Sequence, residues 1–453
     1  MMHAGYWASP NCLLRSFVSS YDRKEKVNYM SISSSNSPFR SFLITIGPGL
    51  LVAATGVGAG DLGTAAFTGN KLGVTILWVV TLGAFLKFVL NEGLARWQLA
   101  TGQTLLEGAV IRLGPVISFI FLPYLLLWSF FVGSALMSAC GVAMHAILPI
   151  FDQASQGKIL FGIIHSLIGV MLVLVGGFVL FEKVMNVCII FMFFCVVLTA
   201  ATVCENWADV VTGLLLPRIP QLGSGGLGWT IALMGGVGGT LTVLCYGYWM
   251  REKERTEASE LRTCRIDLGF AYAATAIFGI SMVIIGSTIQ IEGTGASLIV
   301  DLADKLEISL GTVGRWMFLI GAWGAIFSSL LGVWQSVPYI FADFWGLIQA
   351  KDRDPTYATE VDTKSLPYRG YLFAIAIVPM VGLFFGFKQV QKVYAVFGAM
   401  FMPFLAVVLL ILNGRPVWVG PHRNRVITVI VLVVILAIFV FFGYLQLRKK
   451  LGI

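Results

Sequence analysis

The residues best suited to chemistry are a carboxylate and two hydroxyls inside a glycine-rich stretch. Residues 47–64 read GPGLLVAATGVGAGDLGT, and Asp61 is the one charged residue among them. Glycine weakens a helix, and bare backbone at membrane depth is tolerated only where it is buried in protein or lines a polar cavity. A carboxylate at that depth is costly and marks a candidate functional site. The pattern predicts a broken helix that binds an ion, with these candidate residues: Thr55, Gly58, Ala59, Gly60, Asp61 and Thr64.

A simpler interpretation of the same stretch is also open. The glycines would then be close-packing points between helices, and Asp61 would lie at the water interface. A second stretch favours the broken-helix interpretation. Residues 235–240 read GGVGGT and interrupt a later hydrophobic run in the same way.

The elements that must position these residues are membrane helices. Of 453 residues, 57% are hydrophobic and 12% are charged, whereas soluble proteins carry roughly 25% charged residues. The apolar runs are close to the roughly 20 residues that cross a bilayer. The net charge of +8 comes mainly from bases in loops, so it does not indicate nucleic-acid binding. The composition predicts a multi-pass membrane protein in a bacterial-type inner membrane or a plasma membrane.

Hydrophobic runs predict eleven spans. They lie at about 42–68, 73–99, 116–148, 159–178, 180–203, 228–250, 268–290, 313–347, 370–387, 390–413 and 426–446. The first and sixth are interrupted by glycines, and two interrupted spans in corresponding positions indicate an inverted-repeat transporter with its site at the midplane. We therefore expect a first repeat at 42–203, a second at 228–413 and an extra span at 426–446. Residues 1–41 are polar and are expected to be a disordered cytoplasmic tail.

The basic residues predict the orientation. With eleven spans, the N-terminal tail and the base-rich loops at 251–265, 349–369 and 414–425 fall on one side. The loop at 292–309, on the other side, carries four acids and one base. The positive-inside rule then places the N-terminus in the cytoplasm.

Three segments carry a family resemblance. GPGLLV at 47–52, RWQLATG at 96–102 and MPF at 402–404 resemble segments of the NRAMP (natural resistance-associated macrophage protein) family of metal-ion transporters. The resemblance implies the two-repeat LeuT-type fold, all-α, with five plus five helices and an eleventh helix. It also implies that helices 1 and 6 are broken at the midplane, and that the protein is a secondary transporter working by alternating access.

The functional positions depart from the family pattern. The family's Asp-Pro-Gly-Asn falls on residues 58–61, so its metal-ligating Asp becomes Gly58. Its Met-Pro-His falls on Thr242, Val243 and Leu244, with Gly239 at the preceding carbonyl position. The acidic pair that the family associates with proton movement falls on Leu127 and Phe130. The soft thioether that selects transition metals is therefore missing, and hard oxygen donors remain.

Two kinds of substrate fit what remains. Asp61 with hydroxyls and carbonyls could bind Na⁺ or a hard cation such as Mg²⁺. The N-terminal ends of the second half-helices could instead bind a small anion, because they present free N–H groups and the positive end of the helix dipole. The losses favour the anion, for which bicarbonate is a reasonable candidate, with Na⁺ at Asp61 as a coupling ion. The first alternative is a Mg²⁺ or Mn²⁺ transporter, and the second is a non-transporting sensor on the same fold.

Other function classes find less support in the sequence. A channel would need a selectivity ring, and the sequence contains no HExxH, GxSxG, CxxC or Walker motif of an enzyme. We expect no cofactor beyond a coupling Na⁺, and the expected partners are a small inorganic ion and the lipid bilayer, without nucleic acid. The oligomeric state is not predicted.

Several polar residues inside the spans have a structural interpretation. Lys87 and Asn91 lie four residues apart on one helix face, which favours a structural pair over contact with substrate. His165 is expected to be a hydrogen-bonded packing residue. The charged segment 251–267 is expected to be a solvated helical extension of the sixth span.

Overall fold

The computed structural model describes residues 47–56, 58–289, 295–349 and 361–451. The predicted disordered tail at 1–41 lies outside these residues, so the following concerns the compact unit that begins at Pro48. All regular elements of the described residues are helices.

The helices follow the chain in this order: α3 (Gly47–Gly56), α4 (Ala59–Leu72), η2 (Val74–Ile76), α5 (Leu77–Thr101), α6 (Leu105–Leu113), α7 (Pro115–Ile147), α8 (Ala154–Val203), α9 (Trp207–Leu215), η3 (Leu222–Ser224), α10 (Gly226–Gly236), η4 (Leu241–Leu244), α11 (Cys245–Glu252), η5 (Ala258–Glu260), α12 (Leu261–Ser287), α13 (Leu298–Gln349), α14 (Leu366–Ile377), η6 (Val378–Phe384), α15 (Phe387–Ala399), α16 (Phe401–Leu412), α17 (Pro416–Val419), η7 (Gly420–His422) and α18 (Val426–Leu451).

Nine stretches of the described chain are long and apolar enough to cross a membrane. The bent pair Phe193–Val203 and Trp207–Leu215 would make ten. The predicted span at 42–68 corresponds to α3 and α4, each shorter than a full span. The number of spans is therefore close to the prediction, and the first one is built from two short helices.

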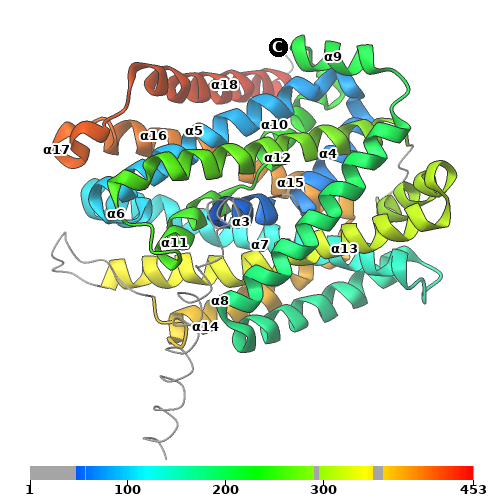
Figure 1. The fold of residues 1–453 in the computed structure, drawn as a ribbon, viewed down its shortest axis with the longest axis horizontal. Helices are drawn as coiled ribbons and strands as arrows, with labels where there is room; N and C mark the ends of the chain where they lie inside the picture. The colour runs from blue at the N-terminus through cyan, green and yellow to red at the C-terminus, as the bar shows by residue number, and fades with distance from the viewer. Residues whose placement is uncertain (1–46, 57, 290–294, 350–360, 452–453) are drawn as a thin grey trace, which may run out of the picture. The chain divides into compact units, whose positions relative to one another are not determined.

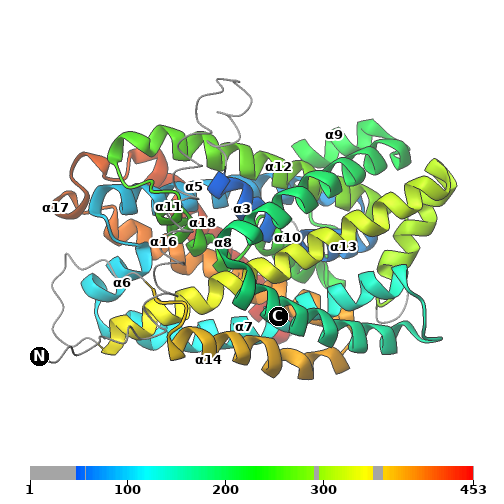
Figure 2. The ribbon, with the colours of Figure 1, turned by 60° about the horizontal axis from the view of Figure 1, so that its bottom comes forward.

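The two interrupted helices lie at the centre of the helix bundle, where α4 packs against α10 and α12, and α10 packs against α5 and α15 (Figures 1 and 2). Small residues permit this close packing. A Cβ atom on Gly235 would lie 2.6 Å from the carbonyl oxygen of Ala395 in α15. A Cβ on Gly286 of α12 would lie 2.6 Å from the Cα of Ala66 in α4.

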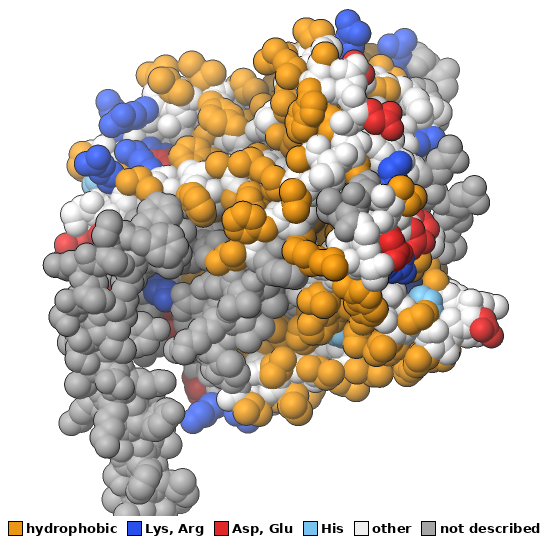
Figure 3. Space-filling model, turned by 45° about the vertical axis from the view of Figure 1, so that its right-hand side comes forward, with side chains coloured by type: hydrophobic (Ala, Val, Ile, Leu, Met, Phe, Trp, Pro, Cys, Tyr) orange, Lys and Arg blue, Asp and Glu red, His pale blue; other side chains and the backbone are white. Residues whose placement is uncertain are grey.

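The outer surface is apolar, as a lipid-facing surface must be. Phe119 and Val175 are 81% and 82% exposed, and Figure 3 shows broad areas of hydrophobic side chains on the face in view. Exposed apolar area of this extent is unusual for a soluble monomer. It supports the prediction of a membrane protein.

The limits of individual helices are wrong in places, although the predicted spans at 159–178, 313–347 and 390–413 agree closely with the apolar stretches Ala154–Val175, Gly311–Gln349 and Phe387–Leu412. The predicted spans at 159–178 and 180–203 both lie in α8, whose ribbon changes direction along its length (Figures 1 and 2). The span at 313–347 belongs to the longer α13, which contains a break at Gly311 (φ 67°). The span at 390–413 is divided between α15 and α16 at Met400. Hydrophobicity reports burial in lipid and does not reveal where a helix bends.

The prediction for residues 251–267 is also wrong. α11 ends at Glu252, a turn follows, and α12 starts at Leu261. Glu254 in that turn has a φ of 56°, which ends the helix. Arg255, expected in solvent, is 5% exposed.

Candidate functional site

The break in the first interrupted helix leaves Asp61 at a helix start. α3 ends at Gly56 and α4 begins at Ala59, with Gly58 as its N-cap. The break thus lies slightly before the predicted Gly58–Asp61, and Asp61 belongs to the first turn of α4. A carboxylate there interacts favourably with the positive end of the helix dipole. Asp61 is fully buried.

The break in the second interrupted helix matches the prediction at 235–240. α10 ends at Gly236, and the chain runs without helix to Thr240 before η4 begins. Gly238 and Gly239 have φ angles of 74° and 81°, which L-residues with a side chain rarely adopt. The two glycines therefore determine where the helix opens.

The two breaks touch. The backbone N–H of Gly238 lies 3.2 Å and 3.3 Å from the two carboxylate oxygens of Asp61 and donates to both. A Cβ on Gly60 would lie 3.4 Å from the carbonyl oxygen of Gly236. One break thus supplies the acid, and the other supplies an amide that binds it.

Lys87 of α5 reaches the same place from a third helix. Its side chain is 1% exposed, and its ammonium donates to the carbonyl oxygens of Gly235 (2.6 Å), Val237 and Gly239. These carbonyls belong to the end of α10 and the break, where the helix leaves C=O groups unpaired and its dipole is negative. The three N–H donors of the ammonium match three carbonyl acceptors.

This role of Lys87 is not evident from the sequence. The spacing of Lys87 and Asn91, four residues apart, identifies a shared helix face but not the partner opposite. In the structure Asn91 donates to the hydroxyl of Tyr272 at 3.2 Å. The available signal was a lysine deep in a hydrophobic span, which is a functional-site candidate for the same reason as Asp61.

The other predicted residues of the first break lie around it with varied roles. Ser329 of α13 occupies the space that a side chain at Gly58 would need, and the carbonyl oxygen of Ala325 lies 3.2 Å from that position. The hydroxyl of Thr64 accepts from Gln391 at 3.1 Å. The hydroxyl of Thr55 donates back to Val52 in its own helix at 3.0 Å. The structure brings Gly60 and Asp61 together with the second break, places Gly58 against α13 and turns the Thr55 hydroxyl elsewhere.

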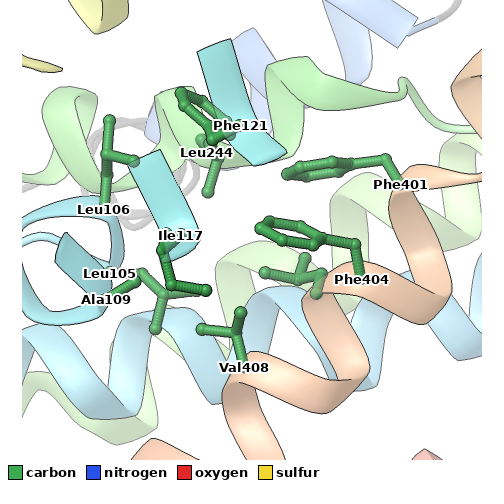
Figure 4. Close-up of a pocket in the computed structure, with 10 residues that line it drawn as sticks. Leu105, Leu106, Ala109, Ile117, Phe121, Leu244, Phe401, Phe404 and Val408 are labelled. Atoms are coloured by element: carbon green, nitrogen blue, oxygen red, sulfur yellow. The ribbon is translucent and has the colours of Figure 1, made fainter. Parts of the chain in front are cut away.

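The predicted residues after the second break divide into two groups. Gly239 contributes its carbonyl oxygen to Lys87, as described above. Thr242 and Val243 are buried in η4. Leu244 instead lines an apolar pocket with Phe121 and Phe401, formed where α6, α7 and α16 meet η4 (Figure 4). That pocket is hydrophobic throughout its lining and offers nothing to an ion.

The third helix does not provide a proton relay at the positions named by the resemblance. Leu127 is 49% exposed on the outer surface, and Phe130 is apolar. Between them, Trp128 points inward and donates to the hydroxyl of Thr240 at 2.8 Å. His165 contacts the carbonyl of Phe161 at 2.7 Å through Nδ1 and accepts from Trp323 at 2.8 Å through Nε2, which fixes a neutral tautomer.

A second buried carboxylate lies where the turn after α11 meets α3 and α12. Asp267 of α12 accepts from the amide of Gly49 (2.8 Å), the hydroxyl of Tyr246 (3.0 Å) and the guanidinium of Arg255 (2.8 Å). We call these four residues the Asp267 cluster. A Cβ on Gly49 would lie 2.6 Å from the carbonyl oxygen of Asp267, which explains the glycine in the GPG segment. The cluster ties α3, α11 and α12 together.

The charge of Arg255 is maintained by its surroundings. Burial lowers the pKa of this guanidinium, but the neighbouring Asp267 raises it, and the pKa ends above its ordinary value. Beside this cluster, Arg251 forms a pair with Glu107 at 2.6 Å, and Arg265 with Glu92 at 2.8 Å.

Comparisons with known proteins agree with this geometry. A structure of the manganese transporter from Eremococcus coleocola is similar with a TM-score of 0.66 and 18% identity, over 89% of this chain and 87% of that one. A structure of MhsT in complex with L-phenylalanine gives a TM-score of 0.55 and 14% identity, over 86% and 98%. At these identities the likeness shows the fold, which is the LeuT-type fold with broken helices.

Sequence comparisons are more specific. The divalent metal cation transporter MntH 1 of Pseudomonas aeruginosa is 32% identical over 78 residues, which is 17% of this chain and 18% of that protein. The family description "Natural resistance-associated macrophage protein-like" matches residues 49–447. Because that match spans nearly all described helices, the chain belongs to the natural resistance-associated macrophage protein (Nramp) family of multi-pass membrane transporters and is not an enzyme.

Proposed function

We propose that the protein moves a small inorganic anion, such as bicarbonate, by alternating access at the paired helix breaks, with its N-terminus in the cytoplasm. The observation that carries this proposal is the ammonium of Lys87, bound to the carbonyls of Gly235, Val237 and Gly239. Those carbonyls are the groups that a transported cation would need at the second break.

The fixed charge opposes a divalent cation. A divalent ion about 4 Å from the ammonium would be repelled by about 8 kcal/mol at an effective dielectric constant of about 20. The ligand set adds to this effect. The side chain at 58 is absent, Ser329 occupies its space, and no thioether stands at 242–244. A dehydrated transition-metal ion therefore has few donors here.

The same features favour an anion. The first turn of α4 presents amides without intrahelical partners and the positive end of a helix dipole. The charge of Lys87 offsets that of Asp61, so an anion meets no net negative charge from this pair. A planar oxyanion could accept from several such amides at once.

A divalent metal cation is the second candidate, because the related proteins named above are metal transporters. Asp61 and the break carbonyls are hard oxygen donors suited to Mg²⁺ or Mn²⁺. This function requires that the ammonium of Lys87 leave the carbonyls during each cycle. A sensor on the same fold remains the third candidate.

Uptake into proteoliposomes distinguishes the three. Labelled bicarbonate at alkaline pH, Mn²⁺ and Mg²⁺ are supplied separately, each with and without a Na⁺ gradient, and protein-free liposomes serve as the control. We expect saturable uptake of bicarbonate and none of Mn²⁺. Saturable uptake of Mn²⁺ or Mg²⁺, without uptake of bicarbonate, would show that the transported substrate is a cation and not an anion. No uptake of any of them, from protein shown to be folded, would favour the sensor.

A further inference from the structure

Three carbonyl oxygens of one short segment converge on a single nitrogen. Residues 235, 237 and 239 alternate along the chain, and the left-handed conformations of Gly238 and Gly239 allow their carbonyls to turn to the same side. Rings of backbone carbonyls are a common way to bind a monovalent cation. The segment therefore has the form of a cation site whose occupant is a side chain.

The surroundings of this nitrogen also fit a cation site. The carboxylate of Asp61 accepts the backbone N–H of Gly238, the residue between Val237 and Gly239. It also supplies a buried negative charge. Asn91, one turn along α5 from Lys87, is fully buried, and its Oδ1 has no hydrogen-bond partner among the described residues. An unpartnered buried acceptor is costly in a protein interior and marks a position where a cation would be welcome.

We infer that Lys87 is a tethered cation that occupies a monovalent-cation site at the second break, so that the site is complete without Na⁺. The inference rests on the proposed function only in placing the ion site at these breaks. The ammonium of Lys87 then takes the place of the coupling Na⁺ that the sequence led us to expect. It also assigns Lys87 as the residue that excludes free cations from these carbonyls.

Truncation of Lys87 should turn this site into a cavity for a free ion. In Lys87→Ala the three carbonyls and Asp61 lose their positive partner, whereas in Lys87→Met the uncharged side chain fills the same space. Lys158→Ala is the matched control, because Lys158 is also a buried lysine (4% exposed) that donates to a carbonyl, Phe385 at 2.5 Å. That contact lies outside both breaks.

The experiment measures cation binding to the purified full-length chain in lipid nanodiscs. Tm is recorded across concentrations of NaCl and methylammonium chloride, with choline chloride holding the ionic strength constant, and bound ²²Na⁺ is counted. We expect Lys87→Ala to gain a saturable rise in Tm and to bind ²²Na⁺. Parent, Lys87→Met and Lys158→Ala should show neither.

Two results would overturn the inference. Folded Lys87→Ala that neither binds ²²Na⁺ nor responds to either cation would show that the carbonyls form no cation site. Stoichiometric ²²Na⁺ binding by the parent, abolished in Asp61→Asn, would show that an inorganic cation already occupies the site. This measurement tests the inference even if Lys87→Ala does not fold. Because binding is read without transport, failure of the proposed anion transport leaves the result interpretable.

Discussion

Asp61 and Asp267 are both completely buried carboxylates, and each accepts a backbone N–H from an interrupted helix. Asp267 has three partners at 2.8 to 3.0 Å, which are the amide of Gly49, the hydroxyl of Tyr246 and the guanidinium of Arg255. The last of these contacts is an ion pair. Asp61 shares one amide between its two oxygens at 3.2 and 3.3 Å. Its counter-charge, Lys87, binds the same segment through carbonyls.

This difference indicates that the contacts of Asp267 fix helices to one another, whereas those of Asp61 can be exchanged for contacts with an ion. The Asp267 cluster satisfies its carboxylate with short, charge-assisted bonds among α3, α11 and α12, which hold these three helices together. The carboxylate of Asp61 makes two longer contacts to a single amide, which an ion can replace, while Lys87 binds the carbonyls of the same break through short contacts. Four substitutions test this distinction, in order of decreasing expected effect.

Asp61→Asn should have the largest effect. It keeps the shape but leaves the buried ammonium of Lys87 without a counter-charge, at a cost of about 3–5 kcal/mol. We expect uptake of the transported ion to fall to the level of protein-free liposomes. Asp209→Asn, at an exposed position in α9, is the control and should retain uptake. Uptake by Asp61→Asn close to that of the parent would remove Asp61 from the site.

Asp267→Asn should loosen the contact among α3, α11 and α12 while sparing the ion site. It removes the partner of Arg255 and weakens the bond to Gly49, at a cost of about 2–3 kcal/mol. Cys264, which is buried beside Tyr246, should react faster with a maleimide than in the parent, as followed by mass spectrometry. An unchanged labelling rate would mean that the Asp267 cluster does not restrict access to Cys264.

Gly238→Ala should weaken the second break more moderately. Its φ of 74° disfavours alanine, and the new Cβ would lie 2.9 Å from the ring of Tyr272. Strain of this kind costs about 1–3 kcal/mol. We expect a lower Tm and slower uptake, whereas Gly370→Ala, where a Cβ meets nothing within 4 Å, should match the parent. Equal behaviour of the two variants would contradict a break that depends on glycine.

His165→Gln should have the smallest effect. Both ring nitrogens are engaged by Phe161 and Trp323, so the imidazole stays neutral and carries no proton through the transport cycle. The pH dependence of uptake should keep its midpoint, with a small loss of stability from the lost packing on Phe327. A shift of that midpoint would give His165 a role in proton movement.

The sequence predicted what depends on local residue type. The glycines of 56–60 and 235–240 identified both breaks, because several glycines close together weaken a helix locally. The hydrophobic runs identified the membrane helices and their order. The family resemblance then connected these features to the LeuT-type fold.

The partners across the fold could not be predicted. Lys87 and Gly235 are 148 residues apart, and nothing in the pattern around Lys87 indicates a carbonyl acceptor in another helix. Asp267 was overlooked because the charged residues before it resemble a solvated helix, although Arg255 and Tyr246 turn inward to bind it. Such pairs are set by tertiary packing, which hydrophobic periodicity does not encode.

The contact between Gly58 and Ser329 has a consequence for how this transporter can change. A carboxylate at position 58 cannot be introduced by one substitution, because Ser329 and the backbone of Ala325 fill its space. A change in α13 must accompany it, so positions 58 and 329 are coupled. The packing of two small residues therefore limits which side chains this break can carry.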